Sequence, residues 1–301
     1  MTTLPATGPV TSPPRPPAAL RMTPGRRATL AIGVPIALIL IAWFAFSLVA
    51  DIGGASFAVS TTIPLQNGRL VASTGGGDIT VHQGQVSDGT ARLTGKVEYS
   101  LVRPTFTVSA SGISLHCRLP TGNCGLNATL DVPSHTAVDL NTGGGNMQVT
   151  GIQGNVTLDS AGGDVGISGI GGRADVLSGG GNVTASDLGG VLKFGTSGGD
   201  VDGSGLFSPH VTTDSGGGNV TLVFTKVPDY VKVDSSGGDI TIVVPRGNAS
   251  YAIKSQASGG SYSAQVPTND ASRHVIQVDS GGGNISIAEA SCPARRSAHP
   301  K

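Results

Sequence analysis

Residues 162–206 read, in successive blocks of nine, GGDVGISGI, GGRADVLSG, GGNVTASDL, GGVLKFGTS and GGDVDGSGL. Each block begins with two glycines, which cost roughly 0.5 to 1 kcal/mol each relative to alanine inside a regular element and are therefore expected at turns. The fourth and sixth positions of a block are mostly apolar, as the alternation of a β-strand requires. The stretch therefore predicts short strands separated by glycine turns, each strand too short to bury its apolar face alone.

The longer period is eighteen residues, because an asparagine or aspartate follows the glycines of every second block. This series consists of Asn146, Asp164, Asn182, Asp200, Asn219, Asp239 and Asn284. A fixed short period with looser outer copies predicts a solenoid in which each coil packs only on its neighbours. We therefore expect an all-β fold, a parallel, single-stranded β-helix-like solenoid of about 18 residues per coil over residues 70–288.

We interpret the alternating Asn and Asp series as a structural ladder at one turn of every coil. Coils in a parallel stack lie about 4.8 Å apart, so a carboxylate on every coil would be repelled by its neighbours. Interleaved asparagines double the spacing between charges and offer amide donors to the carboxylates above and below. This interpretation predicts a role in stability rather than in ligand binding.

A second acidic series lies five residues before ladder positions, across the glycine turn, and consists of Asp159, Asp214, Asp234 and Asp279. Together with the ladder residues Asp164, Asp200 and Asp239, it could line an edge that binds an ion or a glycan. The alternative is a solvated turn whose Asp and Ser side chains bond to local backbone amides.

A calcium-binding β-roll would place aspartate at the sixth position of each block. This chain instead has apolar residues there, namely Val149, Leu158, Ile167, Val176, Ala185 and Phe194. We therefore expect core packing at this position, no metal site and no cofactor.

Residues 28–50, ATLAIGVPIALILIAWFAFSLVA, carry no charge. As a helix they would measure about 35 Å, enough to cross a hydrocarbon core of about 30 Å. The preceding proline-rich tail, residues 1–27, contains four arginines and no acidic residue, which predicts a disordered tail in the cytoplasm and a single-pass protein of the cell membrane with its repeats outside. The alternative is a signal peptide cleaved near Ala50. We expect residues 51–69 to be a linker and entry strand, and residues 289–301 a disordered tail.

Two of the three cysteines, Cys117 and Cys124, bracket the octet CRLPTGNC. Outside the membrane a disulfide can form, and we predict a structural bridge between them. A metal site would need more cysteines or histidines nearby than His116. Cys292 is left over, and its state stays open.

Charge and motifs argue against nucleic-acid binding and against most enzymes. The formal net charge is zero overall, and the HExxH, Walker and GxGxxG patterns do not occur. The best catalytic alternative is a polysaccharide-acting β-helix enzyme, but that class uses clustered carboxylates beside exposed bases, and the coils offer few bases. We therefore expect no enzymatic activity.

From Cys117 onward the chain shows a cysteine pair, a strand ending in Val132-Pro133, and repeated turns of a small residue, glycine, Asp or Asn, and valine. This order resembles the bacterial surface proteins named the "putative adhesin" family, over roughly residues 70–288. The resemblance implies a β-helix-like domain, often membrane-anchored and sometimes associated with envelope stress, with no agreed ligand and no catalytic residues. The chain departs from many relatives in using GGGN at alternate coils.

These observations predict a membrane-anchored, non-catalytic binding or scaffold module outside the cytoplasm. Its expected partners are the membrane, through one helix, and a cell-wall glycan or an envelope protein. The alternative function is an envelope-stress or signalling component that contacts another membrane protein.

Overall fold

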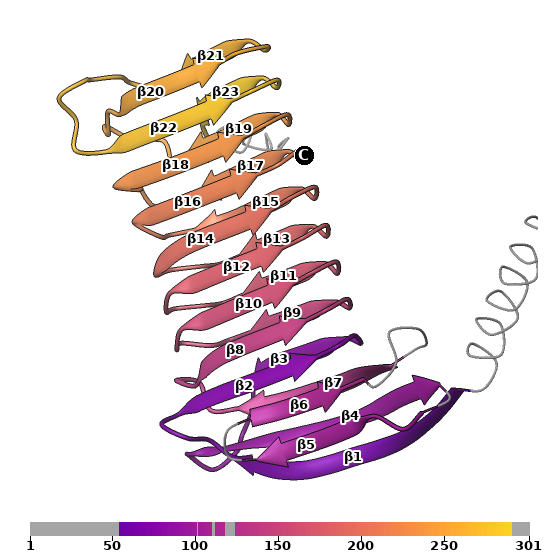
Figure 1. The fold of residues 1–301 in the computed structure, drawn as a ribbon. Coiled ribbons are helices and arrows are strands. Elements are labelled where there is room, and N and C mark those ends of the chain that lie inside the picture. Colours follow the sequence, from indigo (N-terminus) through magenta and orange to yellow (C-terminus); the bar gives the residue numbers. More distant parts are fainter. Residues whose placement is uncertain (1–53, 101, 110–111, 118–123, 291–301) are drawn as a thin grey trace, which may run out of the picture. The chain divides into compact units, whose positions relative to one another are not determined.

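The computed structural model describes residues 54–100, 102–109, 112–117 and 124–290. They form two long β-sheets that face each other along a stack of coils, and each regular coil gives one strand to each sheet (Figure 1). None of the described residues belongs to a helix that could cross a membrane. The predicted span, residues 28–50, lies outside these ranges.

The first sheet, here called sheet A, contains twelve strands. In spatial order they are β1 (Gly54–Pro64), β4 (Thr90–Ser100), β7 (Cys124–Val132), β3 (Ile79–Gln83), β9 (Met147–Thr150), β11 (Val165–Ser168), β13 (Val183–Ser186), β15 (Val201–Leu206), β17 (Val220–Phe224), β19 (Ile240–Val244), β23 (Ile285–Glu289) and β21 (Tyr262–Gln265).

The second sheet, sheet B, contains eleven strands. Their spatial order is β20 (Ala252–Ala257), β22 (Val275–Ser280), β18 (Tyr230–Ser235), β16 (His210–Ser215), β14 (Val191–Thr196), β12 (Ala174–Ser178), β10 (Val156–Ser160), β8 (Ala137–Thr142), β2 (Arg69–Thr74), β6 (Gly112–His116) and β5 (Thr105–Ser109).

The central coils repeat in parallel register, as the eighteen-residue period predicts. Val156 of β10 lies beside Val138 of β8 on one side and Ala174 of β12 on the other. The fourth and sixth block positions point into the space between the sheets and are at most 1% exposed; in residues 162–197 they are Val165, Ile167, Ala174, Val176, Val183, Ala185, Leu192 and Phe194. The core is therefore a stack of thin apolar layers, which explains how a chain with 4% aromatic residues can fold.

The glycine directly before each ladder residue from Asp164 onward is required by the close approach of the neighbouring coil rather than by a positive φ angle. A β-carbon on Gly181 would lie 2.2 Å from the carbonyl oxygen of Gly163 in the adjacent coil. A β-carbon on Gly180 would meet nothing within 4 Å. The residue directly before the Asn or Asp must therefore be glycine, whereas the one preceding it is less constrained.

Buried hydroxyl groups close the same turns from inside. Ser280, at the end of β22, donates to the carbonyl of Gly283 at 3.1 Å and accepts from its N–H at 3.0 Å. Ser160 makes the same pair of bonds with Gly163. These bonds satisfy backbone groups that the tight turn would otherwise leave buried without a partner.

Both ends of the stack depart from simple sequence order, which the repeat did not predict. At the N-terminal end the strands that follow β3 in the chain, β4 to β7, form the outer end of the stack. The chain then returns, so that β9 pairs with β3 on the side opposite to β7. Strands β1, β4 and β5 are antiparallel to their partners. At the C-terminal end β20 and β21 lie outside β22 and β23, although they precede them in sequence (Figure 1).

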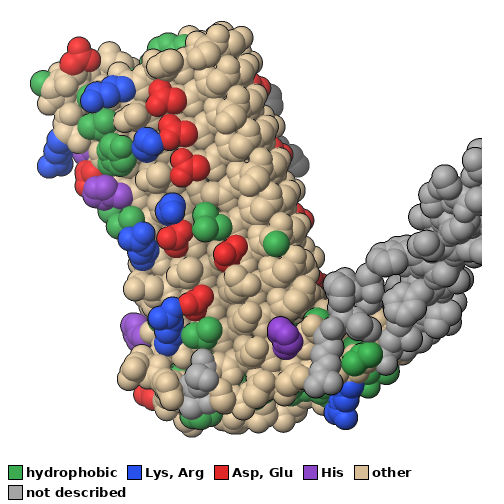
Figure 2. Space-filling model, in the orientation of Figure 1, with side chains coloured by type: hydrophobic (Ala, Val, Ile, Leu, Met, Phe, Trp, Pro, Cys, Tyr) green, Lys and Arg blue, Asp and Glu red, His purple; other side chains and the backbone are tan. Residues whose placement is uncertain are grey.

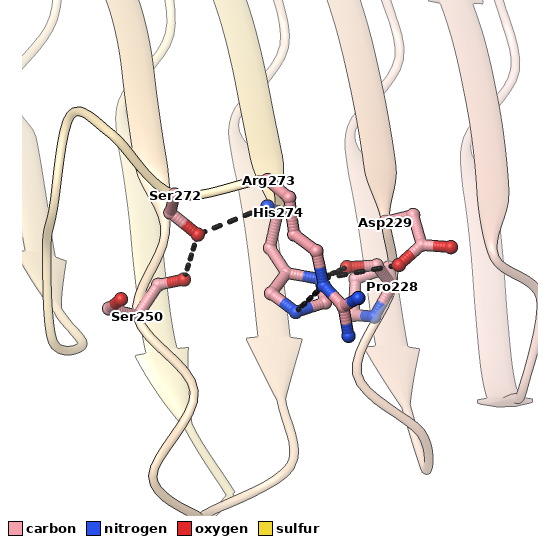
Figure 3. A network of polar contacts seen from close by, with 6 residues as sticks. All are labelled: Pro228, Asp229, Ser250, Ser272, Arg273 and His274. Carbon is pink, nitrogen blue, oxygen red and sulfur yellow. Dashed lines mark hydrogen bonds and ion pairs between the residues drawn. The ribbon is translucent and has the colours of Figure 1, made fainter.

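A polar network fastens the chain that returns from this outer C-terminal coil (Figure 3). The ring Nδ1 of His274 lies 2.9 Å from the carbonyl oxygen of Pro228 and 3.4 Å from a carboxylate oxygen of Asp229. Ser272 donates its hydroxyl to the carbonyl of Ser250 at 2.6 Å. Because a carbonyl can only accept, Nδ1 of His274 carries a proton. The His274 contacts join the start of β22 to the turn before β18, and the Ser272 bond joins it to the segment before β20.

Candidate functional site

All seven residues of the predicted Asn and Asp series belong to one continuous ladder along sheet A, which also includes Asn127, Asp78 and Ser261, three residues that the sequence pattern did not predict. The side-chain Oδ1 of each member accepts a hydrogen bond from the main-chain N–H of the next, at 2.7 to 3.0 Å. In spatial order the members are Asn127, Asp78, Asn146, Asp164, Asn182, Asp200, Asn219, Asp239, Asn284 and finally Ser261.

Asparagine and aspartate alternate strictly in space, although they do not alternate throughout the sequence. Asn127 and Asn146 are consecutive ladder residues along the chain, but Asp78 lies between them in the stack. Asp239 and Asn284 are 45 residues apart and yet adjacent. The alternation therefore follows spatial neighbours, as expected if it keeps carboxylates off adjacent coils.

The bonds within the ladder differ from the expected amide-to-carboxylate pairs. Main-chain N–H groups are the regular donors, and the one amide that donates within the ladder in the described residues is Nδ2 of Asn284, 3.1 Å from Oδ1 of Asp239. At the last coil Ser261 replaces the acidic or amide residue and donates its hydroxyl back to Asn284 at 2.9 Å. The ladder thus ends in a hydroxyl group that bonds back to Asn284, in place of a further carboxylate or amide.

The second acidic series is only partly brought together. Asp214, Asp234 and Asp279 are direct register partners on β16, β18 and β22. Asp159 occupies the same column of sheet B, but Leu177 and Gly195 separate it from Asp214. Three carboxylates at the coil spacing of about 4.8 Å therefore form a compact acidic column, and the fourth stands apart.

A shallow groove of about 700 Å³ runs beside this acidic column, along the coils that contain β14, β16, β18, β22 and β20. It is lined by carboxylates, hydroxyls, one amide and glycine backbone: Thr196, Ser197, Asp214, Ser215, Gly216, Asp234, Ser235, Ser236, Gln256, Ser258, Asp279, Ser280 and Gly281. Figure 2 shows acidic side chains in a column beside basic ones on the upper coils of this face. The sequence pattern predicted the aspartates, but Gln256 and the turn serines follow only from the coil order.

A second groove, of about 570 Å³, lies on the other side of the glycine turns, over sheet A. The ladder residues Asp78, Asn146, Asp164 and Asn182 contribute to its lining, next to Gly166, which has no side chain to fill the surface. The ladder residues Asp200, Asp239, Asn219 and Asn284 lie outside it. The two predicted acidic series therefore border different surfaces and do not converge on a single edge.

Local charges hold the acidic column in place. The Nζ of Lys232 forms an ion pair with Asp234, and this hydrogen bond, with the charges of Asp234 and Asp214, raises the pKa of Lys232 above its usual value. The amide of Gln277 lies 3.3 Å from Asp279. Within the described ranges, no three His, Cys, Asp or Glu side chains converge as ligands of one metal ion. The groove can thus bind hydroxyl or cationic groups by hydrogen bonds and charge.

The disulfide lies elsewhere, at the N-terminal end. Cys117 and Cys124 are joined, with their α-carbons 6.1 Å apart. The bridge links the chain after β6 to the start of β7 and therefore ties sheet B to sheet A in the outer coil. Cys292 lies outside the described residues.

Comparison with known proteins gives a family and a fold. The family model described as Toastrack DUF4097 matches residues 55–288. A crystal structure called a "putative adhesin" from Parabacteroides distasonis aligns with a TM-score of 0.50 and 12% identity, over 77% of this chain and 96% of its own. A second crystal structure called a "putative adhesin", from Bacteroides fragilis, aligns with a TM-score of 0.49 and 17% identity, over 78% of this chain and 97% of its own. The search of curated proteins found no match.

Proposed function

The chain belongs to the Toastrack DUF4097 family, and on that premise we propose that it is a membrane-anchored, non-catalytic binding module whose solenoid lies outside the cytoplasm. The observation that carries the proposal is the open groove beside Asp214, Asp234 and Asp279, which repeats the same polar groups from coil to coil. A surface with this repeat suits an extended ligand that itself repeats hydroxyl or amino groups, such as a cell-wall glycan.

The chemistry of the groove favours binding over catalysis. Its three carboxylates are register partners on one sheet and offer the same hydrogen-bonding group on successive coils. Lys232, the nearby base, is held by Asp234 and keeps its proton. The names of the solved neighbours, "putative adhesin", point the same way.

Anchoring is supported by the sequence before the solenoid. Residues 28–50 are uncharged and long enough to cross a bilayer. Four arginines precede them, and all 19 acidic residues follow them. The positive-inside rule therefore favours a cytoplasmic N-terminus and an external solenoid.

Binding can be tested with purified residues 51–301 against isolated cell-wall glycans, by calorimetry and pull-down. We expect saturable binding that is lost when Asp214, Asp234 and Asp279 are replaced together by asparagine. The matched control is Asp159→Asn, which removes a carboxylate from the same column outside the groove. Binding that survives the triple substitution would contradict the assignment of the groove. No glycan binding at all would favour an envelope protein as partner, as in a signalling component.

A further inference from the structure

Aromatic side chains concentrate at the N-terminal end of the solenoid. The ring of Phe57 on β1 lies 6.2 Å from the ring of Tyr99 on β4 and 6.3 Å from the ring of Phe106 on β5. Nine aromatic residues follow residue 50, so a third of them meet here. All three rings are only partly buried, because β1 and β5 are the edge strands of their sheets and no further coil of the described chain covers this end.

An exposed cation stacks on one of these rings, and an exposed apolar residue precedes it in the chain. Val102 is 39% exposed. The guanidinium of Arg103 stacks on Phe57, 4.8 Å from the ring centroid. Across residues 54–290, apart from the short gaps, no carboxylate lies within ion-pair distance of Arg103. Its charge is therefore available to an external anion, and the ring fixes its position.

The place of this cluster along the chain indicates what it meets. Phe57 follows Ala50, the end of the apolar segment, by seven residues. Seven residues span at most about 25 Å when fully extended. If residues 28–50 cross the membrane, Phe57 and its neighbours cannot lie far from the lipid headgroups.

We propose that Phe57, Tyr99, Val102 and Arg103 form a patch that docks onto the outer surface of the bilayer holding the anchor. Aromatic rings favour the headgroup level, where one side is apolar and the other wet. Arg103 pairs there with lipid phosphates, in the fork geometry that suits guanidinium. The inference rests on the proposed anchoring, and it adds that the solenoid is held against the membrane by this end rather than tethered loosely.

The test uses the full chain in nanodiscs of phosphatidylcholine and phosphatidylglycerol. In a Cys292→Ser background, Val102→Cys receives an environment-sensitive fluorophore, and a fraction of the lipids carries a spin label on the headgroup as a short-range quencher. The matched control is Leu177→Cys, which is 41% exposed in the middle of sheet B. We expect loss of most of the fluorescence at position 102 and little loss at position 177.

Two further readouts separate the possible failures. Comigration of the chain with the nanodiscs tests anchoring, so a chain that does not comigrate contradicts the proposed function itself. A chain that comigrates but shows equal quenching at both positions refutes the docking patch alone. Arg103→Glu should reduce quenching at position 102 in discs with anionic lipid while leaving the melting temperature of the solenoid unchanged. Unchanged quenching in this variant would refute the phosphate contact.

Discussion

Replacing Asn182 by aspartate should destabilise the solenoid through charge alone. Asn182 lies between Asp164 and Asp200, and its Oδ1 accepts the N–H of Asp200 at 2.9 Å. An aspartate keeps this acceptor but places carboxylates on three adjacent coils, about 4.8 Å apart. Each new neighbour costs about 3.5 kcal/mol at an effective dielectric of 20 and about 0.9 kcal/mol in bulk water. Because the site is exposed, we expect the free energy of unfolding to fall by about 2 kcal/mol in total at low salt.

For a domain of this size that loss corresponds to a fall of about 4 to 8 °C in melting temperature, measurable by calorimetry. In 1 M salt, where the screening length is about 3 Å, the deficit should shrink. Neighbouring like charges raise the pKa of the new carboxyl in the folded state. The loss of stability therefore appears only above the unfolded-state pKa of about 3.9, and it should vanish as the pH falls below that value.

The matched control for this substitution is Gln148→Glu, which makes the same chemical change on an exposed position of sheet A. The register neighbours of Gln148 are Thr80 and Gly166, neither of which is charged. We expect less than about 0.5 kcal/mol of change. If Asn182→Asp and Gln148→Glu have the same effect, or if the Asn182→Asp loss is insensitive to salt and pH, the explanation of the alternation by charge spacing is wrong.

Three other outcomes follow from the packing. Gly181→Ala should lower the free energy of unfolding by more than about 2 kcal/mol, because its β-carbon would collide with the carbonyl of the adjacent coil. Gly180→Ala, the matched control, should be nearly neutral. Equal effects of the two substitutions in urea unfolding would contradict this explanation. Burial raises the pKa of Tyr251, whose hydroxyl lacks a hydrogen-bond partner among the described residues. Tyr251→Phe should therefore raise the free energy of unfolding by about 1 kcal/mol at pH 7. The native chain should lose stability as the pH rises above about 10, where the tyrosine ionises more readily in the unfolded chain, and the Phe variant should not show this loss. Breaking the Cys117–Cys124 bridge by Cys117→Ser should cost about 2 kcal/mol, and unreduced peptide mapping of the native chain should recover the linked pair.

The short period made the coil and its core predictable, because each layer repeats the same local pattern. Val165 and Ile167 could be assigned to the core from alternation alone, and their burial confirms it. The requirement for glycine at position 181 could not be predicted in the same way, because the carbonyl oxygen that excludes a β-carbon there belongs to another coil. Sequence spacing predicts which residues share a column but not which coils are adjacent.

The ends of the solenoid could not be predicted, because no repeat governs the order of coils there. Nothing local shows that Asp78 lies between Asn127 and Asn146, or that the coil containing Ser261 closes the stack. The acidic column was predicted as a series of four, yet Leu177 and Gly195 isolate Asp159. These facts depend on long-range pairing, to which short-range periodicity is insensitive.

The most direct test of the account is the topology of the chain in intact spheroplasts that express it with an N-terminal tag. Added protease should remove the solenoid and spare the tag together with residues 1–27. Loss of the tag would reverse the orientation. A mature chain beginning near residue 51, found by N-terminal sequencing, would contradict the anchor and with it the proposed docking of the solenoid on the membrane.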